Sequence, residues 1–187
     1  MRVDIKAPLT KEEAAKLRAG DIVSLTGYIY TGRDAAHKRM VEGFEKTGKF
    51  PFDIKDQIIY YVGPSPAKPG NPVGSAGPTT SGRMDAYAPV LLDNGSTGMI
   101  GKGARTAEVI EAMKRNKAVY FGATGGAAAL IAKHIKSAEV IDYADLGTEA
   151  IHRFYVEDMP LVVIIDSEGN NLYEEGRKEY LKEHKPE

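Results

Sequence analysis

The sequence of 187 residues contains no cysteine and no tryptophan, and aromatic residues make up only 8% of it. Without cysteine, the chain by itself can form no disulfide, no thiolate nucleophile and no cysteine-ligated zinc or iron–sulfur site. No two histidines have the i, i+4 spacing of a helical metal site; they are His37, His134, His152 and His184. We therefore expect this chain alone to bind no metal.

The sequence also lacks a long apolar run and an excess of charge of either sign. No stretch approaches the roughly 18 apolar residues of a membrane span, and the charged N-terminal region does not resemble a signal peptide. The 25 basic and 26 acidic residues leave a net charge of -1, whereas binding to nucleic acid usually needs a basic excess. We expect a cytoplasmic protein that contacts neither membrane nor nucleic acid.

Strand and helix patterns alternate along the chain, which predicts an α/β fold in one compact domain over residues 1–187. Thr10 and Glu13 fit a capping box at the first helix. A segment rich in proline and glycine, residues 64–82, is expected to be a loop. Strands are predicted at 21–32, 57–63, 96–103, 118–124, 139–143 and 159–173, and helices at 10–20, 34–47, 85–92, 106–117, 125–138 and the C-terminal end.

The turn TGRDAAHKR, residues 31–39, lies where a strand meets a helix. An arginine at such a point is held near the positive end of the helix, and Arg33 could bind a carboxylate or phosphate through two hydrogen bonds. Asp34 could orient Arg33 or favour the helix start, and His37 could line the same site. The structural alternative is a solvated arginine beside a helix cap.

The turn GPTTSGRMDAY, residues 77–87, places backbone donors, hydroxyls and Arg83 at the start of a predicted helix. Anion-binding turns are built from such groups. The turn is not a Walker A loop, because the spacing and the final Gly-Lys-Ser/Thr are missing. The structural alternative is that Thr79 or Thr80 serves as a helix N-cap.

The turn GMIGKGA, residues 98–104, places Lys102 between two glycines, where the alternative is an exposed lysine in a tight turn. A fourth glycine-containing segment, residues 122–135, lacks the G-x-G-x-x-G spacing of a dinucleotide site, so we favour helix–sheet packing for it.

Taken together, the turns predict a cationic pocket rather than a complete catalytic site. No serine–histidine–aspartate set or pair of carboxylates emerges from the spacing. Two arginines would suit a substrate with two carboxylates, and the pocket resembles half of an active site. Its predicted members are Arg33, Arg83, Lys102, Thr79 and Thr80.

The three turns, in this order, resemble the C-terminal domain of class I fumarate hydratases and the separate β-subunits of two-subunit fumarases and L-tartrate dehydratases. The likeness covers nearly the whole chain, and TGRDAAHKR and PTTSGRMD are its most specific motifs. It implies a "swivelling" β/β/α domain. It also implies a [4Fe–4S] cluster held by three cysteines of a partner α-subunit, and a homodimer or α2β2 assembly.

Carried over to this sequence, the resemblance implies that Arg33, Arg83 and Lys102 bind the substrate carboxylates and that Thr79 is the catalytic base. The implied reaction is the reversible hydration of fumarate to L-malate, active only with the α-subunit, whose open iron would act as a Lewis acid. Gly82 and Asp85 beside Arg83 favour fumarase over L-tartrate dehydratase or a related hydroxy-dicarboxylate dehydratase. A non-catalytic dicarboxylate-binding or regulatory module is the alternative of another class.

Overall fold

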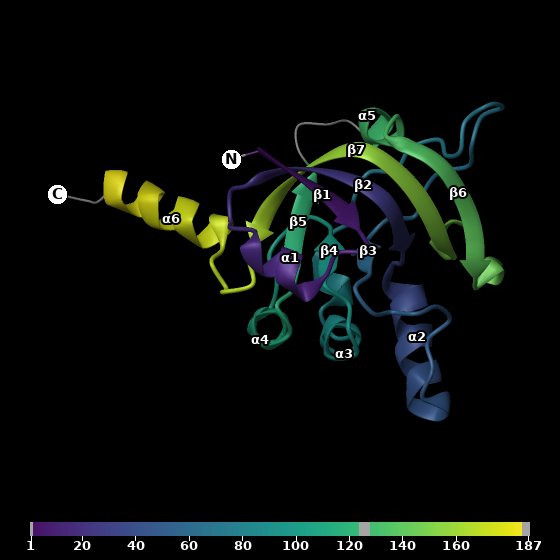
Figure 1. Ribbon diagram of the computed structural model, residues 1–187, viewed down its shortest axis with the longest axis horizontal. Coiled ribbons are helices and arrows are strands. Elements are labelled where there is room, and N and C mark those ends of the chain that lie inside the picture. The colour runs from purple at the N-terminus through teal and green to yellow at the C-terminus, as the bar shows by residue number, and fades with distance from the viewer. Residues whose placement is uncertain (1, 124–127, 185–187) are drawn as a thin grey trace.

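The computed structural model, which describes residues 2–123 and 128–184, is organised around a seven-stranded sheet (Figure 1). Its strands are β1 (Arg2–Ala7), β2 (Ile22–Thr31), β3 (Ile58–Tyr60), β4 (Gly98–Ile100), β5 (Val119–Ala123), β6 (Ile135–Asp142) and β7 (Ile151–Ile165). The α-helices are α1 (Lys11–Lys16), α2 (Asp34–Thr47), α3 (Ala88–Asp93), α4 (Ala107–Asn116), α5 (Ala128–Ala132) and α6 (Leu172–Glu183), and two 3-10 helices, η1 (Ser81–Met84) and η2 (Ala144–Glu149), lie in turns.

The sheet closes into a barrel through β7. Strands β2, β3, β4 and β5 run parallel in that order, and β7 pairs antiparallel with both β5 and β2. The register sets Leu25 against Met159 on one side of β7 and Gly122 against Val162 on the other. β1 extends the barrel along β2, and β6 extends it along β7. The structure confirms the predicted α/β class and a single compact domain.

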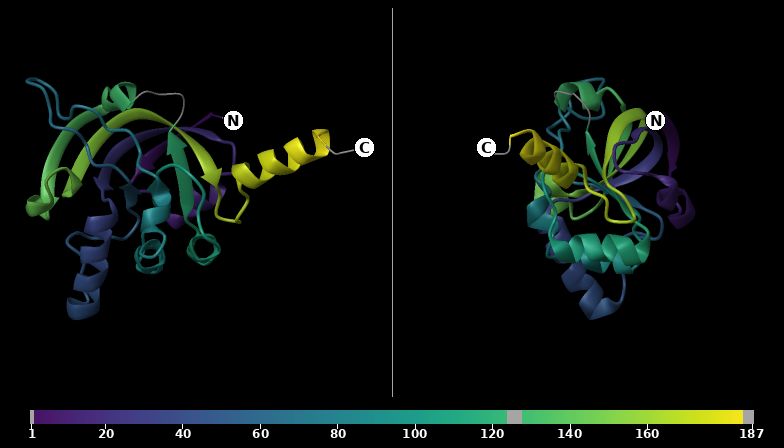
Figure 2. Two further views of the ribbon diagram at one scale, coloured as in Figure 1. Left: turned by 180° about the vertical axis from the view of Figure 1, so that it is seen from behind. Right: turned by 90° about the vertical axis from the view of Figure 1, so that its left-hand side faces the viewer.

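Alternation along the strands divides the apolar side chains into two buried clusters. On β3, Ile58 and Tyr60 belong to a cluster that draws on every strand of the closed ring. Ile59 and the following Tyr61 belong to a second cluster, formed between the sheet and the helices α2, α3 and α4. These three helices lie together on one side of the sheet in each view (Figures 1 and 2).

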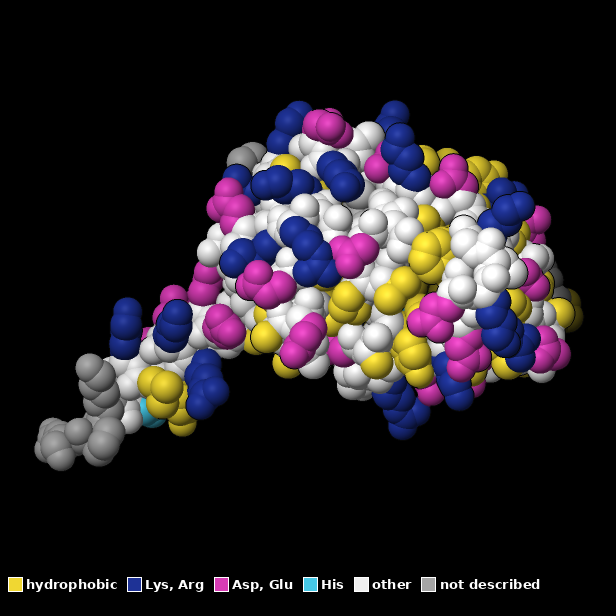
Figure 3. Space-filling view, turned by 90° about the horizontal axis from the view of Figure 1, so that it is seen from below, with side chains coloured by type: hydrophobic (Ala, Val, Ile, Leu, Met, Phe, Trp, Pro, Cys, Tyr) yellow, Lys and Arg dark blue, Asp and Glu magenta, His cyan; other side chains and the backbone are white. Residues whose placement is uncertain are grey.

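Helix α6 differs from the other helices because it extends away from the body of the protein (Figures 1 to 3). None of its residues is buried, and Tyr180 and Leu181 are both more than half exposed. Among residues 2–123 and 128–184, no helix combines the length and the apolar character that crossing a membrane requires.

The helix predicted over residues 125–138 is wrong in its second half. The α-helix spans only Ala128–Ala132, and Ile135–Asp142 forms β6, because antiparallel pairing with β7 overrides the local helix propensity. Residues 124–127 of the glycine-rich segment lie outside the described residues. The helix predicted from residue 85 starts at Ala88, after the 3-10 turn η1, whereas the cap of the first helix is confirmed by the hydrogen bond from Glu13 N to Thr10 Oγ1.

Candidate functional site

Two of the predicted turns lie at the carboxyl ends of parallel strands, the end of the sheet at which α/β proteins commonly bind ligands. The turn that carries Arg33 follows β2, and the turn that carries Lys102 follows β4. The end of β3 lies between them: Gly32 N donates to Tyr60 O at 3.0 Å, and Tyr61 N donates to Ile100 O at 2.8 Å. The sheet therefore fixes the order and spacing of the two turns.

The second turn, which contains Thr79 and Arg83, joins the other two through its backbone. Thr79 N donates to Tyr61 O at 2.7 Å, and Lys102 N donates to Thr79 O at 3.3 Å. Ser81 N in turn donates to Lys102 O at 2.8 Å, which makes a short parallel bridge at Thr80 and Lys102. The structure thus brings Thr79, Thr80 and Lys102 together, as one ligand site would require.

The side chains on these two turns are available for a ligand. Thr79 is half-buried, and Thr80, Arg83 and Lys102 are exposed. Within the described part of the chain, neither threonine hydroxyl has a hydrogen-bond partner and neither cation forms an ion pair. The charge of Arg83 and Lys102 is therefore free to meet an anion.

Arg33 is held more tightly, against Gly63 at the end of β3. A methyl group at Gly63 would lie 3.1 Å from Arg33 Cδ, so glycine makes room for the arginine. Its guanidinium lies between two carboxylates, with Nη2 3.9 Å from Asp34 Oδ1 and Nε 3.5 Å from Glu149 Oε1. Arg33 Nε is buried and makes no hydrogen bond to any described residue. The two carboxylates therefore orient the guanidinium of Arg33 but leave hydrogen-bond donors of that group without an acceptor among the described residues.

His37 lies behind Arg33, where its side chain has no exposed surface. Its Nδ1 is 2.8 Å from Arg33 O, and its ring packs edge-on against Tyr61 at 5.3 Å. Burial lowers the pKa of His37 to about 4, so the ring is neutral at pH 7. A neutral ring donates Nδ1–H to the carbonyl oxygen, which makes His37 a support for the turn of Arg33.

Thr80 occupies the N-cap position of η1, but its side chain makes no capping hydrogen bond. Its backbone is committed to the bridge with Lys102, and its side chain is exposed. The structural alternative of a capping threonine at this position is therefore wrong, and the hydroxyl has no structural task among the described residues.

Two residues that organise the site were not predicted from the sequence. Glu149 comes from η2, far from Arg33 in the chain, and no local pattern marks it. Arg105 is buried beside Asp85, with Nε 2.7 Å from Oδ1. Arg105 does have a sequence signal: it directly precedes the N-cap Thr106 of α4, where the helix dipole disfavours a cation unless a carboxylate compensates.

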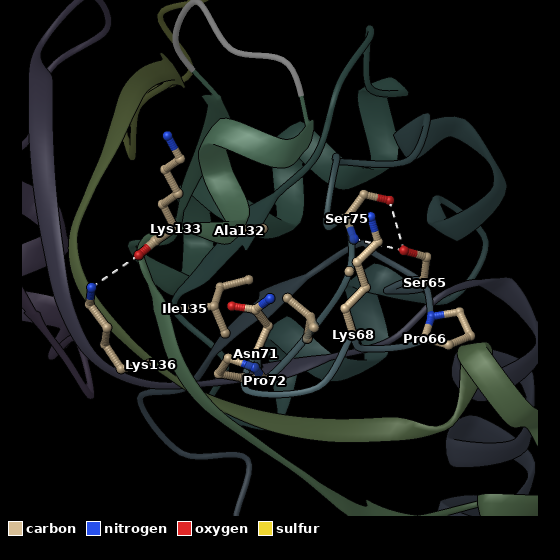
Figure 4. Close-up of a pocket in the computed structure, with 12 residues that line it drawn as sticks. Ser65, Pro66, Lys68, Asn71, Pro72, Ser75, Ala132, Lys133, Ile135 and Lys136 are labelled. Atoms are coloured by element: carbon tan, nitrogen blue, oxygen red, sulfur yellow. Dashed lines mark hydrogen bonds between the residues drawn. The ribbon is translucent and has the colours of Figure 1, made fainter.

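A separate hollow of about 710 Å³ lies between the loop of residues 64–76 and the segment that joins α5 to β6 (Figure 4). Lys68, Lys133 and Lys136 line it, and the hydroxyls of Ser65 and Ser75 meet at 3.0 Å on its wall. None of the predicted site residues lines this hollow.

Comparison with known proteins places this sequence in a family. The sequence profile described as "Fumarase C-terminus" matches residues 1–176. The chain belongs to the fumarase C-terminus family. Its relatives include the aerobic class I fumarate hydratase of Escherichia coli K12, which is 41% identical over 180 residues, covering 94% of this chain and 33% of the relative. The mitochondrial fumarate hydratase 1 of Leishmania major is 38% identical over 177 residues, which cover 92% of this chain and 32% of that protein.

The chain therefore spans about a third of the length of the fumarate hydratases it matches in the fumarase C-terminus family. A relative of similar length is the putative L(+)-tartrate dehydratase subunit beta of Methanocaldococcus jannaschii. It is 39% identical over 176 residues, which cover 91% of this chain and 90% of that protein. The family resemblance predicted from the three turns is confirmed.

Proposed function

We propose that this chain is the β-subunit of a two-subunit hydro-lyase that reversibly hydrates fumarate to L-malate. The observation that carries the proposal is the meeting of Thr79, Thr80 and Lys102 at the carboxyl ends of the parallel strands, with Arg33 on the neighbouring turn. A set of cations with free hydroxyls, on a rigid backbone, suits a dicarboxylate better than a neutral substrate.

The proposed roles follow from the charge that the reaction develops. Removing a proton from the carbon next to a carboxylate builds negative charge, which Arg33, Arg83 and Lys102 would stabilise while they hold the carboxylates. Thr79 would accept that proton. A threonine hydroxyl is a weak base, and a cation close to it would favour its deprotonated form. The backbone contact between Thr79 and Lys102 supports this role, because it places a lysine on the turn beside the hydroxyl. The neighbouring Thr80 would bind substrate through its exposed hydroxyl.

The iron–sulfur cluster expected of the family does not fit this chain. A [4Fe–4S] cluster needs thiolate ligands, and the sequence has no cysteine. Among the described residues, no group of three histidines, aspartates or glutamates could hold a metal ion either. We assign the cluster to a cysteine-bearing α-subunit. The name of the tartrate dehydratase relative, a subunit beta of nearly the same length, supports a separate partner.

Two finer points belong to the same proposal. We propose that the barrel with its helices, over residues 1–187, is the family's swivelling β-subunit domain, and that the assembly is a homodimer or α2β2. Fumarate is the favoured substrate because Gly82 and Asp85 flank Arg83 and Met84 as in the fumarase form of the motif. L-tartrate is the second candidate, supported by the relative from Methanocaldococcus jannaschii.

The test compares the chain alone with the chain assembled on a cysteine-bearing α-subunit. After anaerobic iron–sulfur reconstitution, we expect the isolated chain to show no cluster spectrum and no hydration of fumarate, and the assembly to show both. A [4Fe–4S] spectrum or turnover from the isolated chain would overturn the two-subunit proposal. An assembly that dehydrates L-tartrate faster than L-malate would move the substrate to the second candidate.

A further inference from the structure

A buried ion pair lies directly beneath the turns that carry Thr79, Arg83 and Lys102. Arg105 and Asp85 have side chains that are 0% and 6% exposed, and Arg105 Nε donates to Asp85 Oδ1 at 2.7 Å. Asp85 follows Arg83 by two residues, and Arg105 follows Lys102 by three. The pair therefore ties the end of one turn to the end of the other.

The guanidinium of Arg105 is fixed from several directions. Nη2 donates to the hydroxyl of Tyr61 at 3.1 Å, and Nη1 lies 3.4 Å from the sulfur of Met99. The rings of Tyr61 and Tyr120 flank the guanidinium, with its carbon 5.2 and 4.8 Å from their centroids. Only a planar group with donors on several edges can satisfy all these contacts at once, so lysine cannot replace it.

Each partner of Arg105 also contacts one of the turns. Tyr61 accepts the backbone N–H of Thr79 through its carbonyl oxygen. Tyr120 OH lies 2.7 Å from Ser81 Oγ and donates to Gly103 O at 2.9 Å. Burial raises the pKa of Tyr61 and that of Tyr120, so both phenols stay protonated at neutral pH. Arg105 is therefore the centre of a network that reaches both turns.

The second oxygen of the carboxylate completes the connection. Asp85 Oδ2 accepts the backbone N–H of Thr106 at 2.8 Å, at the N-cap of α4. Buried ion pairs contribute little net stability compared with apolar residues of similar volume, because removing the charges from water is unfavourable. Stability alone therefore gives little reason for an Arg–Asp pair at this position, whereas fixed geometry in the turns above it does.

We propose that Arg105, held by Asp85, Tyr61 and Tyr120, is a positioning residue that keeps the Thr79–Arg83 turn in register with Lys102 for catalysis. We call the contacts of Arg105 with Asp85, Tyr61 and Tyr120 the clamp, because they connect the two turns. The catalytic part of this inference rests on the proposed hydro-lyase function, whereas the clamp does not. Arg105 itself touches no substrate in this proposal; it acts through the backbone of Thr79, Ser81 and Lys102.

The test uses Arg105→Lys, with Arg115→Lys as a matched control. Arg115 lies in the last turn of α4, the helix that Arg105 precedes, and it forms a two-pronged pair with Asp93 at the end of α3, with both bonds at 2.8 Å; that pair is exposed and contacts neither turn. Hydrogen–deuterium exchange of backbone amides in the chain alone measures how firmly the clamp holds the two turns together. We expect the amides of Ser81 and Lys102 to exchange at least about tenfold faster in Arg105→Lys, with core amides of β5 unchanged. Arg115→Lys should leave all of them unchanged.

Activity of the assembled enzyme reports the catalytic part. A displacement of the base of about 1 Å lowers the rate by about 10²-fold, so kcat should fall by that order in Arg105→Lys and stay at the wild-type value in Arg115→Lys. The deuterium isotope effect on dehydration of malate labelled at C3 should also rise, because proton removal becomes slower. A reduced folded fraction alone would leave that isotope effect unchanged.

The outcomes separate the two proposals. Unchanged exchange at Ser81 and Lys102 would overturn the clamp, whatever the activity. Faster exchange with wild-type kcat and isotope effect would show that the position of the turns set by Arg105 does not matter for catalysis, and would overturn that part of the proposal. A wild-type assembly without hydratase activity would overturn the proposed function and leave the clamp standing on exchange. If Arg105→Lys does not fold, Tyr61→Phe replaces it, because this variant removes only the hydroxyl that accepts the hydrogen bond from Arg105 Nη2. The same changes in exchange, kcat and isotope effect are then expected for Tyr61→Phe.

Discussion

The backbone N–H of Ser81 donates to the carbonyl oxygen of Lys102 at 2.8 Å, although the two residues lie far apart in the sequence. This bond joins two glycine-containing turns that local sequence describes only as separate features. With the return bond from Lys102 N to Thr79 O at 3.3 Å, it fixes the backbone of Lys102 against the backbone of Thr79 and Ser81. The two turns therefore form one continuous surface of the protein.

If Arg33 and Arg83 each bind a carboxylate, replacing either by lysine keeps the charge and loses the planar fork. We expect kcat/KM of the assembled enzyme to fall by about 10²-fold, on the order of 3 kcal/mol. Arg39→Lys is the control, because Arg39 forms an exposed two-pronged pair with Asp145 on the outside of α2. Steady-state kinetics that place all three variants at the wild-type value would remove both arginines from the site.

The roles of Thr79 and Thr80 can be distinguished by replacing each with valine, which keeps the shape of threonine and removes its hydroxyl. If Thr79 moves the proton, kcat of Thr79→Val should fall by roughly 10²–10⁴-fold. Because Thr80 makes no capping hydrogen bond, Thr80→Val should change the free energy of unfolding by less than about 0.5 kcal/mol. It should largely keep kcat but raise KM, because the proposed role of its hydroxyl is to bind substrate. The measurements are kcat and thermal unfolding of both variants. Full kcat in Thr79→Val would exclude Thr79 as the base.

The close contact between the turns predicts a strong effect of a single methyl group at Gly101. A Cβ at this position would lie 2.1 Å from Ser81 Oγ and 2.8 Å from Tyr61 Cδ2, so the Ser81 turn must move. We expect Gly101→Ala to lose about 1–3 kcal/mol of stability, with kcat falling as well.

The control for that experiment is Gly82→Ala on the same turn as Ser81, where a new Cβ meets no described atom within 4 Å. Its unfolding midpoint in urea should match the wild type. Equal midpoints for both variants would show that the turns are not packed as closely as the structure indicates.

Burial of His37 makes stability depend on pH. The pKa of His37 is lowered from 6.5 to about 4 in the folded chain, so the unfolded state binds a proton first as the pH falls. Stability should therefore be complete above pH 6.5 and decrease between pH 6.5 and about 4, by at most about 3 kcal/mol. Urea unfolding at pH 7 and 4.5 measures the change. His37→Asn should flatten this part of the profile, and the exposed His184→Asn should not; identical slopes would contradict the prediction.

The sequence predicts the individual turns well because their signals are local. Gly48 ends α2 with a left-handed backbone, and Thr10 caps α1, as the patterns require. It fails where distant segments decide the structure. Residues 135–138 continue a helix pattern yet pair with β7, and nothing near Arg33 reveals that Glu149 lies beside it. The closure of the barrel by β7 is likewise a long-range fact, absent from any local window.

The pairing of β7 with both β2 and β5 determines how late in synthesis the barrel can close. Val23 of β2 pairs with Leu161, and Phe121 of β5 pairs with Val163. The outer edges of β2 and β5 therefore stay unpaired until β7, the last strand in the chain order of the sheet, is available. A chain emerging from the ribosome exposes those edges, which are templates for wrong pairing, until residue 165 has left the exit tunnel. Because β7 pairs with strands far from it in the chain, closure of the barrel is expected to be the slow step of folding.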